Sequence, residues 1–224
     1  MKKLINYINE SAAKVELTSD GMEHGFEYVD LGLPSKTMWA TCNVGAATPE
    51  DNGLLFQWGR VGGYYYGDRK HNFKRPEDNL SATNNEEIPE TTSGRTYKCG
   101  DILNYSDDVA RVNMTGKWRM PTKDEMEELI NNTTHTVKTI NRMKGMLFTS
   151  NINGHSIFMP FCGMYDHWDN TYCCKNIWTN LFTSNVDDDN ETDACALYFD
   201  KEDHVKLYIW GKAYAGPIRG VFKK

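Results

Sequence analysis

The sequence predicts a protein of short β-strands and packed loops with few helices, not a helical bundle. Hydrophobic residues make up 39% of its 224 residues and aromatic residues 12%, with six Trp and twelve Tyr. Aromatic side chains favour half-buried pleated surfaces, so this balance indicates short strands. Segments that alternate polar and apolar residues recur along the chain, whereas few stretches have a helical period. The length fits one large domain, or one domain with an added arm.

The first residues predict a separate amphipathic helix. Four apolar residues recur at spacings of three, four and three, and therefore lie on one helix face: Ile5, Ile8, Ala12 and Val15. Ser19-Asp20-Gly21 ends the pattern. A helix of about four turns is marginally stable alone in water. Two alternatives follow: the helix packs on its own domain, or residues 1–24 are an arm that docks on another protein or on copies of itself.

Two strands are expected where the globular domain begins. Glu27–Leu31 alternates polar and apolar residues, and Met38–Cys42 is the next apolar stretch after a turn. Thr48-Pro49-Glu50 has an N-cap Thr and a Pro at the first helical position, which predicts a short helix to about Leu54. Phe56–Gly59 is then expected to return as a core strand or turn.

Residues 61–115 show no sustained period and predict a long excursion over the surface. The clearest helix follows them. Thr122 and Glu125 form a T-x-x-E capping box, which marks a helix N-terminus. Met126, Leu129 and Ile130 are spaced to form its buried stripe.

The remaining chain predicts strands in hairpins. Asn153-Gly154 is a strong hairpin signal between expected strands at 145–149 and 156–160. The other expected strands are 194–199, 204–209 and 218–222.

Two segments are dense in Trp, Gly and Pro: YVDLGLPSKTMWATCNVGAATPEDNGLLFQWG at 28–59 and GKWRMPTKDEMEEL at 116–129. Both resemble signatures of the Fibrobacter succinogenes major paralogous domain family, and the first is the more specific. The rest of the resemblance lies in three segments: SIFMPFCG through Trp178, ALYFDKEDHVKLY and the terminal GPIRGV. The chain departs from the family pattern at Lys36, Arg60 and Gly220.

The resemblance implies an α+β fold of the C-type-lectin-like class, related to formylglycine-generating-enzyme-like domains. Residues 25–224 would form short antiparallel strands, two helices and long loops, with the terminal strands paired. Trp118 and Trp178 match tryptophans that pack in the family core. Such a framework suits binding by variable loops on a rigid scaffold.

The implied function is that of a non-enzymatic structural or binding protein. Family members are often exported surface proteins of gut bacteria, and related domains occur in their phages. The chain shows no secretory signal, which together with the N-terminal helix favours a phage virion component, synthesised in the host cytoplasm and docked on the particle. The alternative is a cell-associated module of a bacterium that binds glycan or protein, and a cryptic enzyme is the third hypothesis.

Composition narrows the partners. The formal charge of −6 disfavours nucleic acid, which requires clustered Lys and Arg. No apolar run reaches about 18 residues, so no membrane insertion is expected. The expected partners are other virion proteins or further copies of the chain at the N-terminal helix, and a host-surface glycan or protein at the loops. The six cysteines are expected to be free thiols.

The candidate binding residues lie in the aromatic segment 164–178. Aromatic faces bind sugar rings and protein hot spots. We therefore predict ligand or partner contacts for Tyr165, His167, Trp168 and Tyr172.

An acidic run is the candidate for a cation. Asp187, Asp189 and Glu191 offer the carboxylate oxygens that calcium favours, but consecutive acids in a loop usually face water, so calcium is the alternative to a solvated loop. No catalytic motif and no paired-His metal spacing occurs in the sequence. We therefore expect no catalytic residues, no metal site and no cofactor.

Overall fold

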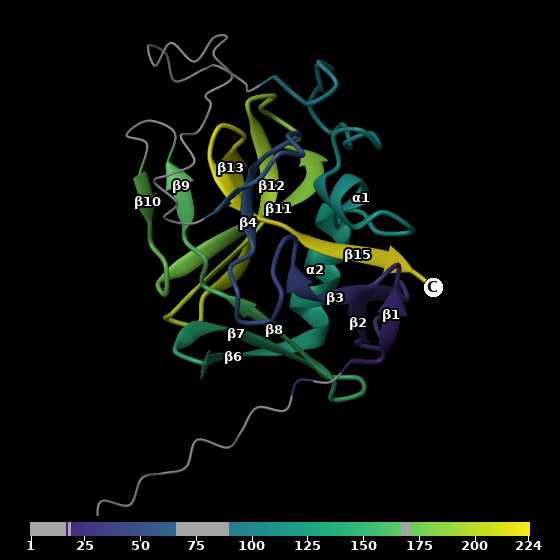
Figure 1. Cartoon of the computed structure of the whole chain (residues 1–224), viewed down its shortest axis with the longest axis vertical. Helices are drawn as coiled ribbons and strands as arrows, with labels where there is room; N and C mark the ends of the chain where they lie inside the picture. The colour runs from purple at the N-terminus through teal and green to yellow at the C-terminus, as the bar shows by residue number, and fades with distance from the viewer. Residues whose placement is uncertain (1–16, 18, 66–89, 167–170) are drawn as a thin grey trace, which may run out of the picture.

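The computed structural model describes residues 17, 19–65, 90–166 and 171–224 (Figure 1). The predicted N-terminal helix, with Ile5, Ile8, Ala12 and Val15, lies outside the described residues. Of the described residues, 46% lie in strands and 9% in helices, and the strand pairs of the sheets are antiparallel. The chain is therefore mainly antiparallel β-structure with two helices in its described part, which agrees with the expected α+β class.

The elements follow one another in this order. The two helices are α1 (Val109–Met114) and α2 (Lys123–Asn132). The strands before α1 are β1 (Gly21–Glu23), β2 (Phe26–Asp30), β3 (Thr37–Asn43), β4 (Leu54–Gln57) and β5 (Tyr64–Tyr65). After α2 come β6 (Thr133–Ile140), β7 (Met143–Ser150), β8 (Ser156–Pro160), β9 (Met164–Asp166), β10 (Thr171–Cys173), β11 (Trp178–Val186), β12 (Asp193–Asp200), β13 (Val205–Gly211), β14 (Ala215–Pro217) and β15 (Arg219–Lys223).

The two ends of the folded chain meet in one sheet. This sheet has the order β1-β2-β3-β15, so the last strand pairs with β3 (Figure 1). A further antiparallel bridge joins Arg119, just before α2, to Val221 of β15. The segment that leads into α2 is therefore tied to the closing strand.

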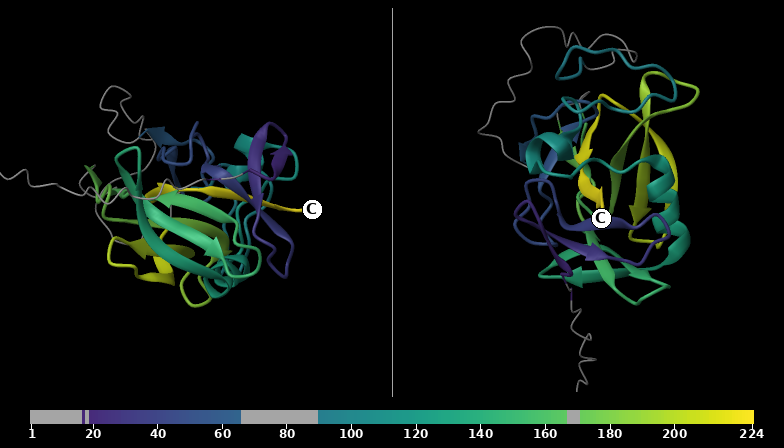
Figure 2. Two further views of the ribbon diagram at one scale, coloured as in Figure 1. Left: turned by 90° about the horizontal axis from the view of Figure 1, so that it is seen from below. Right: turned by 90° about the vertical axis from the view of Figure 1, so that its right-hand side faces the viewer.

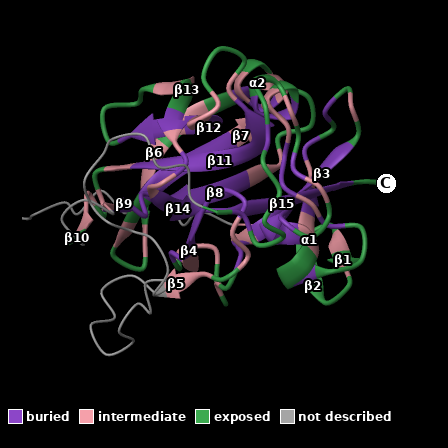
Figure 3. Ribbon diagram, turned by 90° about the horizontal axis from the view of Figure 1, so that it is seen from above, coloured by how far each residue is buried: buried purple, intermediate pink, exposed green. Residues whose placement is uncertain are grey.

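Three further sheets complete the body. Their orders are β10-β9-β14-β4-β5, β11-β12-β13 and β6-β7-β8. Helix α2 lies along the β11-β12-β13 sheet and contacts all three of its strands (Figure 2). Two large apolar clusters lie between the layers, and Trp39, Trp58 and Trp118 are fully buried in them. The buried residues concentrate in the central strands, among them β8, β11 and β12 (Figure 3).

Most of the elements predicted from local patterns are confirmed. Thr122 caps α2 and forms the complete capping box with Glu125. Met126 and Leu129 are buried against the core, and Ile130 is partly buried. The hairpin around Asn153-Gly154 joins β7 to β8.

Three expectations need correction. The helix predicted from Thr48 is wrong: the segment is a turn closed by one bond from Asp51 N to Thr48 O, and β4 starts at Leu54. The described chain does have two helices, but the one other than α2 is α1, which follows the N-cap Asp108. It lies within residues 61–115, for which the sequence showed no sustained period. Trp178, expected in the core, is half-buried at the start of β11.

The boundary of the folded body also differs from the expected one. Strand β1 starts at Gly21 and pairs with β2, so residues 21–24 pack with the domain although the sequence placed them in the arm.

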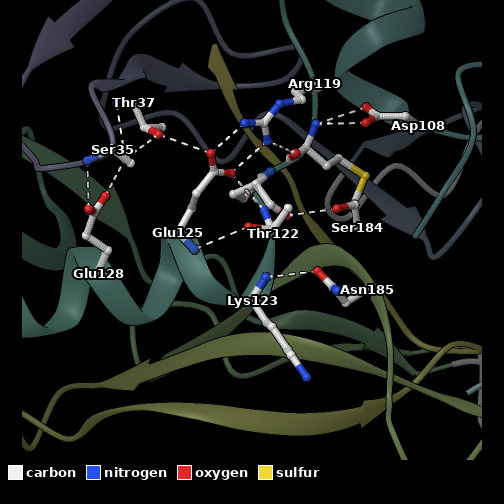
Figure 4. Close-up of polar contacts among 12 residues, drawn as sticks. Ser35, Thr37, Asp108, Arg119, Thr122, Lys123, Glu125, Glu128, Ser184 and Asn185 are labelled. Carbon is white, nitrogen blue, oxygen red and sulfur yellow. Dashed lines mark hydrogen bonds and ion pairs between the residues drawn. The ribbon is translucent and has the colours of Figure 1, made fainter. Parts of the chain in front are cut away.

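One buried carboxylate joins the N-terminal strands, helix α2 and the closing strand (Figure 4). Glu125 accepts hydrogen bonds from Arg119 Nη1 (2.7 Å), Thr122 N (3.0 Å) and Thr37 Oγ1 (3.0 Å). Arg119 in turn exchanges two backbone bonds with Val221, at 3.0 and 2.9 Å. We call Thr37, Arg119, Thr122 and Glu125 the Glu125 node.

Neighbouring contacts extend the Glu125 node to the rest of the frame (Figure 4). Both oxygens of Asp108, the cap of α1, accept the N–H of Met120 at 3.0 Å. Ser184 N donates to Pro121 O, and Lys123 N donates to Asn185 Oδ1, which fixes the segment on β11. Burial acts to raise the pKa of Glu125, but hydrogen bonding and the charge of Arg119 outweigh it and hold the pKa below its ordinary value.

We predict that Glu125→Gln destabilises the protein by about 2–4 kcal/mol, because it leaves the half-buried Arg119 without its charged partner. Urea unfolding measures the change. Glu127→Gln, an exposed substitution on the same helix, is the control and should cost less than about 0.5 kcal/mol. Equal stability of the two variants would show that the Glu125 node does not hold the frame.

The same pair of proteins gives a pH prediction. Because folding lowers the pKa of Glu125, its contribution is complete above the ordinary value of 4.5 and is lost as pH falls through the lower folded-state value. The stability difference between wild type and Glu125→Gln should therefore narrow below pH 4.5. A difference that widens on acidification would contradict this assignment.

Candidate functional site

One face of the β11-β12-β13 sheet is buried at one end and open at the other. Side chains alternate between faces along a strand, so Ala194, Ala196, Tyr198 and Asp200 share one face of β12. The partners opposite them place Trp210, Tyr208 and Lys206 of β13 on that same face. Phe182 and Trp178 of β11 join them through their pairing with Ala196 and Asp200.

The closed end of this face is a stack of aromatic rings. Phe182 and Trp210 stack with centroids 4.7 Å apart, and Trp210 stacks on Tyr214 at 5.5 Å with nearly parallel planes. Phe182 and Trp210 belong to the larger apolar core. This end of the sheet is therefore fixed by packing.

The open end carries three more rings. Trp178 and Tyr198 are half-buried, and Tyr208 is 44% exposed. The ring centroids of Trp178 and Tyr198 are 6.1 Å apart, and those of Tyr198 and Tyr208 are 6.0 Å apart. We call Trp178, Tyr198 and Tyr208, with the polar side chains of Asp200, His204 and Lys206, the aromatic face.

The ammonium of Lys206 lies over two of these rings. Its Nζ is 5.5 Å from the centroid of Tyr198 and 5.3 Å from that of Tyr208. Attraction between a cation and an aromatic ring holds such a side chain without immobilising it, because the residue is exposed. Lys206 therefore places a positive charge beside these rings.

A buried carboxylate orders the polar side of the aromatic face. Asp200 Oδ2 accepts a hydrogen bond from the Tyr198 hydroxyl (2.8 Å) and lies 2.9 Å from His204 Nδ1. Its other oxygen accepts the N–H groups of Glu202 and His204, which closes the turn between β12 and β13. The turn, the histidine and the tyrosine are thus held by one side chain.

These contacts contribute to shifts in the pKa values of Asp200, His204 and Tyr198. Burial acts to raise the pKa of Asp200, but the hydrogen bonds from His204 and Tyr198 outweigh it and leave the pKa below its ordinary value. The hydrogen bond with Asp200 raises the pKa of His204. Burial, followed by the same carboxylate, raises the pKa of Tyr198 to about 12. Near the ordinary histidine pKa, the aromatic face therefore presents an ion pair beside neutral rings.

A groove lies over the part of the aromatic face formed by Tyr198 and Tyr208, and Trp178 adjoins it through Tyr198. It has a volume of about 630 Å³, within the roughly 300–1,000 Å³ range of small-molecule sites. Its lining combines Tyr198 and Tyr208 with the Asp200–His204 pair and Lys206. Rings that can stack and polar groups that can hydrogen-bond therefore face the same space.

The binding residues predicted from the sequence lie elsewhere, in the β9–β10 hairpin. Tyr165 and Tyr172 are paired across it with ring centroids 5.0 Å apart, but Tyr165 is buried and Tyr172 is half-buried. His167 and Trp168 lie outside the described residues. In this hairpin the described ring that reaches the surface is Tyr172.

The side chains of the acidic loop make hydrogen bonds within the loop and an ion pair with a neighbouring lysine. Asp187 Oδ2 accepts the N–H groups of Asp189 and Asn190, and Glu191 pairs with Lys98 at 3.0 Å. Across the described ranges, no three His, Cys, Asp or Glu side chains gather in a way that holds a metal ion.

The thiols of the core are protonated rather than activated. Burial raises the pKa of Cys162 to about 12 and also raises the pKa of Cys195. A nucleophilic cysteine requires the opposite shift.

No protein-family model, no curated protein and no solved structure matches this chain. Among the residues that the structure describes, no helix is long and apolar enough to cross a membrane.

Sequence reasoning missed the aromatic face because its rings come from three strands. A signal was present: Tyr198 and Asp200 alternate with Leu197 and Phe199, as Lys206 and Tyr208 do with Leu207. That alternation marks a second, non-core face, but only the strand register shows that Trp178 joins it.

We predict that Asp200→Asn lowers the pKa of His204 toward the ordinary 6.5, because Asp200 is the main cause of its rise. Proton NMR titration of the imidazole measures the shift. Asp203→Asn, one residue from the histidine, is the control and should leave the titration unchanged. The assignment fails if both variants move the His204 titration equally.

Proposed function

We propose that this protein is a non-enzymatic binding module in which a C-type-lectin-like framework presents the aromatic face to a saccharide. The observation that carries the proposal is the open end of the β11-β12-β13 sheet, where three partly exposed rings adjoin an ordered carboxylate and imidazole. Support for the C-type-lectin-like framework comes from the terminal strands that share one sheet, the short antiparallel strands and the two helices of the described chain.

Binding fits the chemistry of the described residues better than catalysis does. The polar groups of the aromatic face hold one another in hydrogen bonds, and Asp200 is already saturated by Tyr198, His204 and the backbone. The buried thiols have raised pKa values, so they are poor nucleophiles.

A saccharide fits the aromatic face through two kinds of contact. The apolar face of a sugar ring stacks on an aromatic ring, and neighbouring polar groups hydrogen-bond its hydroxyls. Tyr208 and Trp178 offer the rings, while His204 and Lys206 are exposed and can donate to hydroxyl oxygens. A bound protein would instead require a wider apolar surface around these rings.

We predict that a glycan array identifies a saccharide ligand and that Tyr208→Ala or Trp178→Ala weakens its binding about ten- to thirtyfold, as loss of a stacking ring does at a hot spot. Isothermal titration measures the affinity. Tyr105→Ala is the control, because Tyr105 is 59% exposed and is not part of the aromatic face. Unchanged affinity in both test variants, with the fold intact by circular dichroism, would remove the aromatic face from the binding site.

The family resemblance extends the proposal to the protein's setting. Related domains in phages suggest a virion component such as a fibre, appendage or decoration protein, with the segment before β1, residues 1–20, docking on the particle or on further copies of the chain. A bacterial cell-associated module is the other setting that the resemblance implies.

The docking proposal has its own test. Ile5→Asp with Ile8→Asp should abolish copurification with particles, because both residues lie on the predicted apolar seam. Asn6→Asp with Asn9→Asp adds the same charge off the seam and should leave incorporation unchanged. Normal incorporation of the first variant, or of a protein lacking residues 2–17, would remove the docking role.

A further inference from the structure

Two adjacent cysteines meet at the surface beside the aromatic face. Cys173 ends β10 and Cys174 begins the turn that leads to Trp178, the first residue of β11. Their Sγ atoms are 3.0 Å apart, and both residues are partly exposed. Two thiols at this distance are open to reagents that react with both together.

The backbone around this pair is tightly held. Cys174 has a φ of 68°, in the left-handed region that non-glycine residues rarely adopt. Its carbonyl oxygen accepts the N–H groups of Ile177 (3.0 Å) and Trp178 (3.2 Å). The position of Trp178 therefore depends directly on the orientation of the Cys174 peptide.

Gly163 packs closely against the backbone of Cys173 and Cys174. A Cβ at this position would overlap the Cys173 carbonyl oxygen and the Cys174 backbone, so only glycine permits the close approach. Gly163 N also donates to Trp178 O at 2.9 Å. The Cys173–Cys174 peptide and Trp178 are thus coupled through one glycine.

We propose that Cys173 and Cys174 form a redox site that closes reversibly to a disulfide when a hydroperoxide is the oxidant, and that closure displaces Trp178. One thiolate attacks the peroxide oxygen, which breaks the O–O bond, releases water or an alcohol and leaves a sulfenic acid. The neighbouring thiol then attacks the sulfenic sulfur, forming the S–S bond and releasing water. The two sulfurs together give up two electrons and two protons, and the peroxide accepts them.

Covalent geometry explains both the reversibility and the displacement. Neighbouring Cα atoms across a trans peptide are about 3.8 Å apart, whereas Cα atoms of ordinary disulfides are roughly 4.4–6.8 Å apart. Closure between neighbours therefore strains the bond and makes it easy to reduce. The strain is relieved by rotation about the backbone bonds on both sides of the Cys174 Cα, which turns the Cys174 carbonyl away from the N–H groups of Ile177 and Trp178.

The other described thiols differ from this pair. Cys162 and Cys195 are buried with raised pKa values, Cys42 is a partly buried residue of β3, and Cys99 is exposed on a separate loop. Cys99 is therefore the control for an exposed thiol that has no neighbouring cysteine in the sequence.

Peptide mass mapping of the full-length protein tests the redox site. After treatment with hydrogen peroxide and iodoacetamide, the peptide that contains Cys173 and Cys174 should carry no alkyl label and lack two hydrogens, and dithiothreitol should restore two labels. Cys99→Ser should leave this result unchanged, whereas Cys173→Ser and Cys174→Ser should each abolish the internal bond. Full alkylation after peroxide, oxidation to sulfinic acid alone, or a bond to another cysteine would overturn the proposal.

Tryptophan fluorescence tests the displacement without any ligand. Oxidation should shift the emission of the wild-type protein, and Trp178→Phe should remove most of that shift. If the disulfide forms and the emission of the two proteins changes equally, the coupling to Trp178 is refuted. Neither readout depends on saccharide binding, so the redox site can fail while the proposed function stands, and the reverse.

Discussion

A single buried carboxylate, that of Glu125, is the constraint on which the described frame depends. A carboxylate removed from water is costly unless hydrogen bonds and an opposite charge surround it. Arg119 and Thr122, just before helix α2, and Thr37 of β3 supply both, and the backbone of Arg119 is bonded to Val221 of the closing strand. The requirement to satisfy one charge therefore fixes the N-terminal strands, helix α2 and the closing strand relative to one another.

This arrangement decides which part of the β11-β12-β13 sheet is left open. Helix α2, which carries Glu125 in its first turn, covers one face of the sheet, where Leu197 and Phe199 are buried. On the other face, the stack of Phe182 and Trp210 fills only the end next to the core. The rings of Trp178 and Tyr208 therefore remain partly exposed as a consequence of the frame. Asp200 then orders the exposed end by closing the turn between β12 and β13.

The sequence predicted those elements whose signal is local. The capping box at Thr122, the Asn153-Gly154 hairpin and the alternating strands need only neighbouring residues, and the structure confirms them. The helix expected after Thr48 failed because a Thr-Pro start carries no information on length, and Gly53, at a φ of 69°, lies just before β4.

The candidate site was harder to predict because its signal is not local in the sequence. Trp178, Tyr198 and Tyr208 come together through the register of two hairpin pairs, which composition and spacing do not contain. The tyrosines chosen from the aromatic segment pack instead on each other across β9 and β10. Local aromatic density thus marked a partly buried cluster, whereas the open face follows from tertiary pairing.

Native-state hydrogen exchange, followed by NMR, tests most directly whether the Glu125 node holds the frame together. The informative amides are those of Met120, Thr122 and Val221, which donate to Asp108, Glu125 and Arg119 respectively. If the account is right, all three exchange only through global unfolding, with the free energy that urea denaturation gives for the whole protein. Exchange at a clearly lower free energy, while the amides of β11 and β12 stay protected, would show that the sheets hold together without the node.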